Sequence, residues 1–190
     1  MSENLGILLD KAVLAQEGVV NSGDFIQLYD DYFPRVYKYM CYRIGDPAIA
    51  DDLTAIVFER ALGKFKEFSS ERGSLGAWIF TISRNTVYQY LRTKRIHNCL
   101  PLEEADSQPV DHPSPEEAMI HIEKQQELLT ALQCLNDRET DLIGLKFAAH
   151  MTNRRIAELT GLSESNVGVI LYRALHKLRA ILVTGEMDHG

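Results

Sequence analysis

The stretch from Thr152 to Leu182 constrains the fold of this chain more than any other. Thr152 can cap a short helix, Gly161 can end that helix in a left-handed conformation, and Ser163 can cap a second helix. In the second helix apolar residues recur every three or four positions, at Val167, Leu171, Ala174, Leu178 and Leu182. Two helices joined by a tight glycine-containing turn predict a helix-turn-helix, whose second helix normally lies in the DNA major groove. A helical hairpin inside an ordinary bundle is the alternative interpretation.

Helical periodicity also dominates the first half of the chain. An apolar face recurs at Phe25, Leu28, Tyr29, Tyr32, Phe33, Val36, Tyr37 and Met40. Pro34 lies inside this pattern and predicts a kink or a restart of the helix. Further helices are expected over about 48–65, with Asp51 and Asp52 in the first turn beside the helix dipole, and over about 75–95. No strand pattern of any length is present, so the chain is predicted to be all-α.

The end of the third expected helix is basic and aromatic. Four basic residues lie between positions 84 and 95 with no acidic residue among them: Arg84, Arg92, Lys94 and Arg95. Tyr88 and Tyr90 are interleaved with these basic residues, and Asn85 lies near the middle of the segment. Cations bind phosphates and aromatic faces stack on unpaired bases, so the pattern fits opened or single-stranded DNA. A solvated helix end whose cations complement the dipole is the alternative.

An acidic segment separates the two helical regions. Residues 96–118 contain four prolines and six acids, which predicts a flexible linker. The whole chain has a net charge of −7, and residues 96–128, with one base and eight acids, account for a charge of −7. The negative total therefore does not exclude nucleic acid, because the local field is what a phosphate backbone meets. The predicted organisation is two small helical domains, 22–95 and 119–184, with a tail or short helix at 1–21 and a tail at 185–190.

Several classes of protein are disfavoured by the sequence. No run of about 18 apolar residues predicts a membrane span, and the N-terminus lacks the features of a secretory signal. The three cysteines show no CxxC spacing, so neither a zinc site nor a disulfide framework is expected, and a cytoplasmic location fits. No catalytic motif is present and the six histidines are scattered, so we expect no enzyme activity, no metal and no cofactor.

Four motifs together point to one family. The first is Phe25-x-x-Leu28-Tyr29-x-x-Tyr32, and the second is Ala50-Asp51-Asp52-Leu53-Thr54-x-x-Val57-Phe58-x-Arg60-Ala61. The third is Ala77-Trp78-Ile79-Phe80-x-Ile82-Ser83-Arg84-Asn85, followed by Leu91-Arg92. The fourth is Leu132-x-x-Leu135, then Ile156-Ala157-Glu158, then Gly161-Leu162-Ser163 through Arg173-Ala174 and Leu178-Arg179. In this order and spacing, they resemble the extracytoplasmic-function (ECF) sigma factors of bacterial RNA polymerase.

The resemblance implies a role for each motif. The second motif would bind the polymerase core through Asp51, Asp52, Thr54, Phe58 and Arg60. The −10 promoter element would be melted and bound by Phe68, Trp78, Arg84, Asn85, Tyr88, Arg92, Lys94 and Arg95. Asn85 would read an extruded base, and the loop 68–76 would form its pocket. The −35 element would be bound by Arg154, Arg155, Ser163, Ser165, Asn166, Gly168, Val169, Tyr172, Arg173 and Lys177. The partners implied are core polymerase, promoter DNA and an anti-sigma factor.

The chain also departs from the family pattern. Ala55 and Ile56 stand where many members have Gln-Glu, and Gln89 stands where an Asp is usual. Gly168 and Ile170 occupy recognition-helix positions where basic residues are common in the family, so fewer contacts with the −35 element are expected. Two alternative functions remain open at this point. One is a helix-turn-helix regulator that never binds polymerase, and the other is a helical adaptor that binds only protein.

Overall fold

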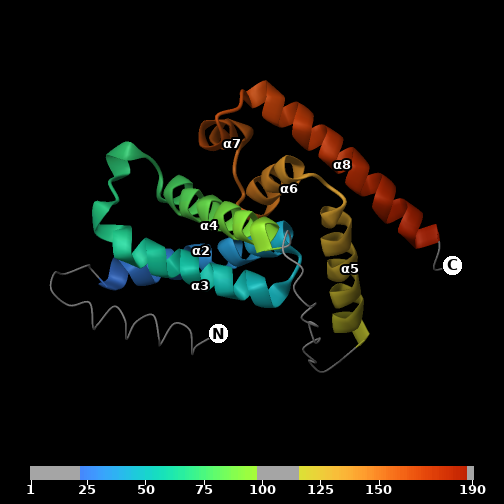
Figure 1. Ribbon diagram of the computed structural model, residues 1–190, viewed down its shortest axis with the longest axis horizontal. Helices are drawn as coiled ribbons and strands as arrows, with labels where there is room; N and C mark the ends of the chain where they lie inside the picture. Colours follow the sequence, from blue (N-terminus) through green and yellow to red (C-terminus); the bar gives the residue numbers. More distant parts are fainter. Residues whose placement is uncertain (1–21, 98–115, 188–190) are drawn as a thin grey trace.

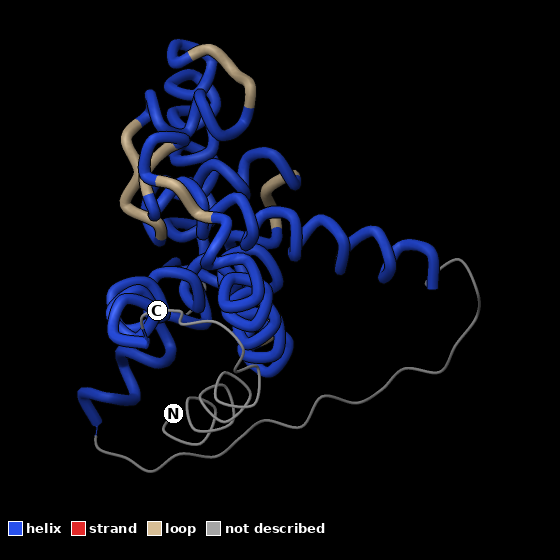
Figure 2. Tube along the Cα trace, turned by 90° about the vertical axis from the view of Figure 1, so that its left-hand side faces the viewer, coloured by secondary structure: helices blue, strands red, loops and turns tan. Residues whose placement is uncertain are grey.

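The computed structural model describes residues 22–97 and 116–187, and these residues form helices without strands (Figures 1 and 2). The all-α prediction is therefore confirmed. None of the helices described is long and apolar enough to cross a membrane. The expectations for residues 1–21, for most of the acidic linker and for the last three residues concern positions outside the described ranges.

The first bundle consists of α2 (Ser22–Ile44), α3 (Pro47–Lys64) and α4 (Leu75–His97), with two 3-10 turns, Phe65–Glu67 and Ser70–Arg72, between α3 and α4. The three helices pack side by side (Figure 1). Their core is built from the apolar positions that the periodicity marks, among them Val36, Met40, Val57 and Val87, which are fully buried. Of the kink or restart expected at Pro34, the restart does not occur, since α2 continues through this residue as one helix.

The start of α3 corrects one expectation. Asp46 is the N-cap, and its carboxylate accepts hydrogen bonds from the N–H groups of Ala48 and Ile49 at 2.9 and 3.2 Å. The helix begins at Pro47, so its first turn contains no acid and Asp51 and Asp52 lie beyond it. The dipole is therefore complemented by Asp46, and Asp51 and Asp52 are left exposed on the helix surface.

The second bundle consists of α5 (Glu116–Gln133), α6 (Asp137–Ile143), α7 (Asn153–Thr160) and α8 (Glu164–Met187). Asn136 caps α6 in a capping box with Glu139. After α6 the backbone widens into a π-helical segment, Gly144–Ala148, in which the N–H of Ala149 donates to the carbonyl of Gly144 at 3.0 Å. Such widened turns are rare and are frequent at functional sites.

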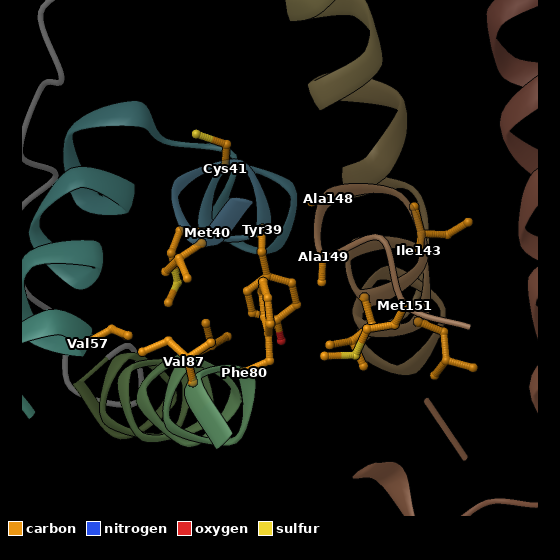
Figure 3. Close-up of a cluster of buried hydrophobic side chains, with 14 of the residues drawn as sticks. Tyr39, Met40, Cys41, Val57, Phe80, Val87, Ile143, Ala148, Ala149 and Met151 are labelled. Carbon is orange, nitrogen blue, oxygen red and sulfur yellow. The ribbon is translucent and has the colours of Figure 1, made fainter. Parts of the chain in front are cut away.

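The two bundles pack against each other, which the sequence did not predict. The π-helical segment lies on α2, and Tyr39 and Phe80 lie on the side of the first bundle that faces Ala149 and Met151 of the second (Figure 3). Gly144 permits this approach, because a Cβ there would lie 2.8 Å from Cδ2 of the Tyr39 ring. The buried side chains of both bundles therefore form one continuous hydrophobic cluster.

Candidate nucleic-acid interface

The helix-turn-helix has the geometry that its sequence predicts. The Thr152 hydroxyl accepts from the N–H of Arg155 at 3.3 Å, and the Ser163 hydroxyl accepts from the N–H of Asn166 at 3.2 Å. Between the two helices Gly161 adopts a left-handed conformation with φ 71°, which only glycine takes at low cost. The predicted capping residues and the predicted turn residue of this unit are confirmed.

Two opposite stripes run along α8. One stripe is buried against the bundle and consists of Val167, Leu171, Ala174 and Leu178. The other is exposed and consists of Ser165, Asn166, Val169, Tyr172 and Arg173. Among the residues that the structure describes, Tyr172 is the most exposed of the large hydrophobic side chains, at 67%. A free helical stripe of hydroxyl, amide, apolar and guanidinium groups can read the edges of base pairs in a major groove.

Glycine at position 168 is not required by packing. A Cβ added there would come no closer than 3.8 Å to the Asn153 side chain, which is ordinary contact. Gly168 is half-buried at the edge of the exposed stripe. The packing would therefore accommodate a larger residue at this position, and a glycine can contribute only its backbone to a DNA contact.

Several basic residues of this bundle already have acidic partners. Arg154 and Arg155 both pair with Glu158, at 3.4 and 2.8 Å. Lys177 pairs with Glu139 at 2.6 Å, which joins α8 to α6. Arg173, in contrast, makes no ion pair with any residue that the structure describes. Of the basic residues predicted to contact the −35 element, Arg173 is thus the one available without breaking an existing interaction.

Glu139 also makes stability depend on pH. Burial acts to raise the pKa of Glu139, but the hydrogen bonds from Lys177 and from the N–H of Asn136 outweigh it and lower the pKa below 4.5. A lowered pKa in the folded state means that the stabilisation is complete above pH 4.5 and is lost as the pH falls through the folded value.

We expect Glu139→Gln to lower the free energy of unfolding by about 1 kcal/mol at neutral pH. Glutamine keeps the capping hydrogen bond but loses the ion pair with Lys177. Urea unfolding of both proteins at neutral pH and well below pH 4.5 measures the effect. The difference should disappear at the acidic pH, and a difference that is the same at both pH values would contradict the assignment.

Asn85, Tyr88 and Arg92 share one exposed face of α4, since they are three, four and seven residues apart. Lys94 is also exposed, while Arg95 pairs with Asp137 of α6. The face continues toward the start of α4 at Thr81, one turn before Asn85. Thr81 lines a hollow, so this face of α4 connects the hollow with the basic end of the helix.

The hollow lies between the end of α3 and the start of α4 and has a volume of about 410 Å³. It is lined by Lys64, Glu67, Phe68, Ser69, Gly73, Ser74, Ala77, Trp78 and Thr81. Phe68 and Trp78 face each other with ring centroids 5.4 Å apart. The structure thus brings together two of the three aromatic residues predicted at the −10 site and the loop expected to form a pocket there. Aromatic walls with a lysine and hydroxyl groups can hold a planar base.

Arg84 is positioned differently from the other basic residues of α4. Its Nε donates to Oδ2 of Asp141 at 3.0 Å, and its Nη1 donates to the carbonyl of Leu159 at 2.9 Å. Tyr88 also donates to Oδ2 of Asp141, at 3.2 Å. Burial acts to lower the pKa of Arg84, but Asp141 outweighs it and the pKa is raised. In this arrangement a carboxylate of the second bundle occupies the position at Arg84 where a phosphate would bind.

The residues predicted to bind polymerase fall into three groups. Asp51 and Asp52 are exposed on α3. Thr54 and Phe58 are fully buried, and the Thr54 hydroxyl donates to the carbonyl of Ala50 at 2.7 Å. These two residues cannot contact a partner directly here, because they belong to the core of the bundle. Arg60 is exposed, and its guanidinium donates to Thr86 and Gln89 of α4 at 3.1 and 2.9 Å, so it joins α3 to α4.

Three important residues were missed by sequence reasoning, namely Asp141, Tyr39 and Arg43. Asp141 is 1% exposed, accepts from the Tyr39 hydroxyl at 2.6 Å, and lies 3.9 Å from Nε of Arg43. In the sequence, the one feature that marks them is a polar side chain next to positions that are buried in the same helix. Among the residues described, no cluster of histidine, cysteine and acidic side chains could hold a metal ion.

Comparisons with known proteins match both bundles. Residues 28–96 match Sigma-70 region 2, and residues 131–180 match Sigma-70, region 4. The chain is 32% identical over 169 residues to the ECF RNA polymerase sigma factor BldN of Streptomyces coelicolor, covering 88% of this chain and 63% of BldN. It is 24% identical to the ECF RNA polymerase sigma factor SigW of Bacillus subtilis, covering 84% of this chain and 91% of SigW.

Two solved structures share the fold. One is the sigma factor RpoE in complex with the anti-sigma factor NepR from Bartonella quintana, with a TM-score of 0.65, 22% identity, and coverage of 84% of this chain and 96% of that one. The other is CnrH in complex with the cytosolic domain of CnrY, with a TM-score of 0.62, 21% identity, and coverage of 94% and 96%. At these identities the likeness concerns the fold alone.

Proposed function

The chain belongs to the sigma-70 family, and on that premise we propose that it is an ECF-type sigma factor of bacterial RNA polymerase. It binds core polymerase, recognises the −10 and −35 promoter elements and melts the −10 region, without covalent chemistry of its own. One observation carries the proposal furthest. The same chain holds an aromatic hollow that continues into the basic face of α4, and a helix-turn-helix with an exposed stripe on α8.

Each bundle binds one of the two promoter elements. The exposed stripe of α8 enters the major groove of the −35 duplex, with Arg173 as the main contact. In the first bundle, a base extruded from the −10 element enters the hollow beside Trp78 and meets Asn85. Arg92 and Lys94 bind phosphates of the −10 element, both in the closed duplex and after the strands open. The exposed acids Asp51 and Asp52 of α3 face basic groups on the polymerase core.

An anti-sigma factor is part of the proposal. RpoE, which shares this fold, was solved in complex with the anti-sigma factor NepR, and CnrH, which also shares it, was solved in complex with the cytosolic domain of CnrY. A partner that covers the exposed faces of α4 and α8 would prevent DNA binding by both bundles. We propose such a partner for this chain also.

The role of Asn85 leads to a kinetic prediction. Asn85→Ala should slow formation of the open complex about tenfold while weakening binding to the closed duplex much less, because the base is read only after it has left the stack. Stopped-flow fluorescence of a base analogue in the −10 element measures the first quantity, and gel shift measures the second. Arg92→Ala is the matched control and should weaken both steps alike. Equal losses for Asn85→Ala would refute the extruded-base role.

The proposed function is tested by run-off transcription. The purified chain is mixed with bacterial core polymerase and a fragment library of the host genome, and transcript 5′ ends are mapped. Defined starts that share −10 and −35 words are the expected result. DNA binding without transcripts would instead indicate a regulator that does not use polymerase. Absence of both transcripts and DNA binding would indicate a protein-binding adaptor.

A further inference from the structure

The contact between the two bundles is centred on one buried carboxylate. Asp141 has four polar neighbours, all from the first bundle: Tyr39, Arg43, Arg84 and Tyr88. Burial and the carboxylate raise the pKa of Tyr39 well above its ordinary value, so its hydroxyl keeps the proton that it donates to Asp141. The side chain of Asp141 therefore contributes to docking of the bundles, since its hydrogen bonds all cross between them.

The contact uses residues that DNA would need. Arg84 and Tyr88 lie on the face of α4 proposed to bind the opened −10 strand, and both bind Asp141 instead. The side chain of Arg84 is only 17% exposed in this arrangement. The Asp141 carboxylate supplies the anion that a DNA phosphate would otherwise supply, so the docked second bundle and the −10 strand compete for the same guanidinium.

The docked arrangement also cannot reach both promoter elements. Elements centred near −10 and −35 are roughly 85 Å apart along straight duplex DNA, at about 3.4 Å per base pair. Arg84 of α4, however, donates to Leu159 in α7, the first helix of the helix-turn-helix, at 2.9 Å. Because the two DNA-binding units touch each other, they have to separate before both elements can be occupied.

The contact has features of a reversible one. The buried atoms Nε of Arg35, and Nε and Nη2 of Arg43, have no hydrogen-bond partner among the residues described. Buried donors left in this way destabilise the docked state, and separation would return them to water. The contact therefore combines a strong central acceptor with unsatisfied groups at its side.

We propose that Asp141 forms a latch that inhibits the free protein, holding the second bundle on Arg84 and Tyr88 until polymerase or DNA separates the bundles. This inference rests on the proposed function, because it assigns Arg84 and Tyr88 to the −10 strand. The hydrogen bonds of the Asp141 carboxylate and the close approach of Gly144 to Tyr39 stabilise the closed state, together with hydrogen bonds from Arg84 to Leu159 and from Arg43 to the carbonyl of Asp137.

Two variants loosen the latch in independent ways. Asp141→Asn keeps the size of the side chain. It replaces one carboxylate oxygen, which accepts hydrogen bonds, with an amide NH2 group, which would face the N–H donors of Arg84. Gly144→Ala places a Cβ 2.8 Å from the Tyr39 ring, while its φ of −59° suits alanine, so the second bundle itself is not strained. Asp137→Asn is the matched control, since it removes the same charge from the same helix at an exposed ion pair with Arg95.

The experiment measures the full-length chain without polymerase. Small-angle X-ray scattering gives the radius of gyration, and fluorescence anisotropy gives the affinity for single-stranded DNA of random sequence. Asp141→Asn and Gly144→Ala should both increase the radius of gyration and raise the affinity about tenfold, because observed affinity scales with the fraction of open molecules. Asp137→Asn should behave like the parent protein.

The outcomes separate the latch from the proposed function. If both variants remain as compact as the parent and bind DNA no better, the latch is overturned, whatever the run-off assay shows. If they expand without a gain in DNA affinity, docking through Asp141 stands but its inhibitory role is overturned. Failure of the proposed function shows itself elsewhere, as a parent protein that directs no transcripts with core polymerase.

Discussion

Phe58→Ala should lower the free energy of unfolding of the first bundle by about 3–5 kcal/mol. The Phe58 ring is fully buried on α3, with its centroid 4.8 Å from that of Tyr29 and 5.8 Å from that of Phe33. Its removal would leave a cavity among aromatic rings that cannot easily collapse. Urea unfolding followed by circular dichroism measures the change. Transcription should also be lost near the unfolding temperature, as an indirect result of instability.

Asp52→Ala is the matched control on the same helix. Asp52 is exposed, so its removal should change stability by less than about 0.5 kcal/mol while weakening binding to core polymerase. The pair of variants separates a core residue from a contact residue within one motif. A Phe58→Ala protein that unfolds like the parent but binds polymerase poorly would show that this ring contacts the partner after all.

The motif around Phe58 illustrates what a resemblance can and cannot predict. The resemblance identified the helix and the residues assigned to polymerase binding. It did not specify which side of the helix each of these residues occupies. Apolar spacing alone allows either Ile56 or Val57 in the core, and the structure buries Val57 fully and Ile56 only in part. Thr54 and Phe58 follow the side of Val57, which is why they are buried as well.

The helices and their ends were largely predictable because their causes are local. The periodicity, the caps at Thr152 and Ser163, and the turn at Gly161 all depend on neighbours in the sequence. The aromatic hollow near Trp78 was also anticipated, through the loop that forms it.

Packing of the two bundles was not predictable, because it depends on contacts between residues far apart in the chain. Tyr39 is separated from Asp141 by 102 positions, and Arg84 is separated by 57. A periodicity argument assigns one buried face to each helix, whereas α2 buries a second face against the π-helical segment. Tyr39 and Phe80 lie on faces of this kind and were therefore left out of the expected cores. A buried Asp141 gives no apolar signal at all.

Arg173→Ala should weaken binding to the −35 duplex by about 1–3 kcal/mol. Arg173 is exposed on the free stripe of α8 and has no acidic partner among the described residues, so its guanidinium is available for a bidentate contact. Fluorescence anisotropy with a duplex carrying the −35 word from the mapped promoters measures the loss. Arg179→Ala removes the same charge two turns later on the helix and should cost much less. An unchanged affinity for Arg173→Ala would remove this residue from the interface.

Salt and sequence then decide what Arg173 contacts. If it reads a base, Arg173→Ala relaxes the preference for the −35 word over a scrambled duplex and leaves the salt dependence nearly unchanged. If it binds a phosphate, both duplexes lose affinity alike and the salt slope falls by about one unit. The stripe of α8 is exposed while the bundles are docked, so neither result requires the Asp141 latch to open. Asp141→Asn should therefore leave affinity for the −35 duplex unchanged, while it raises affinity for single-stranded DNA.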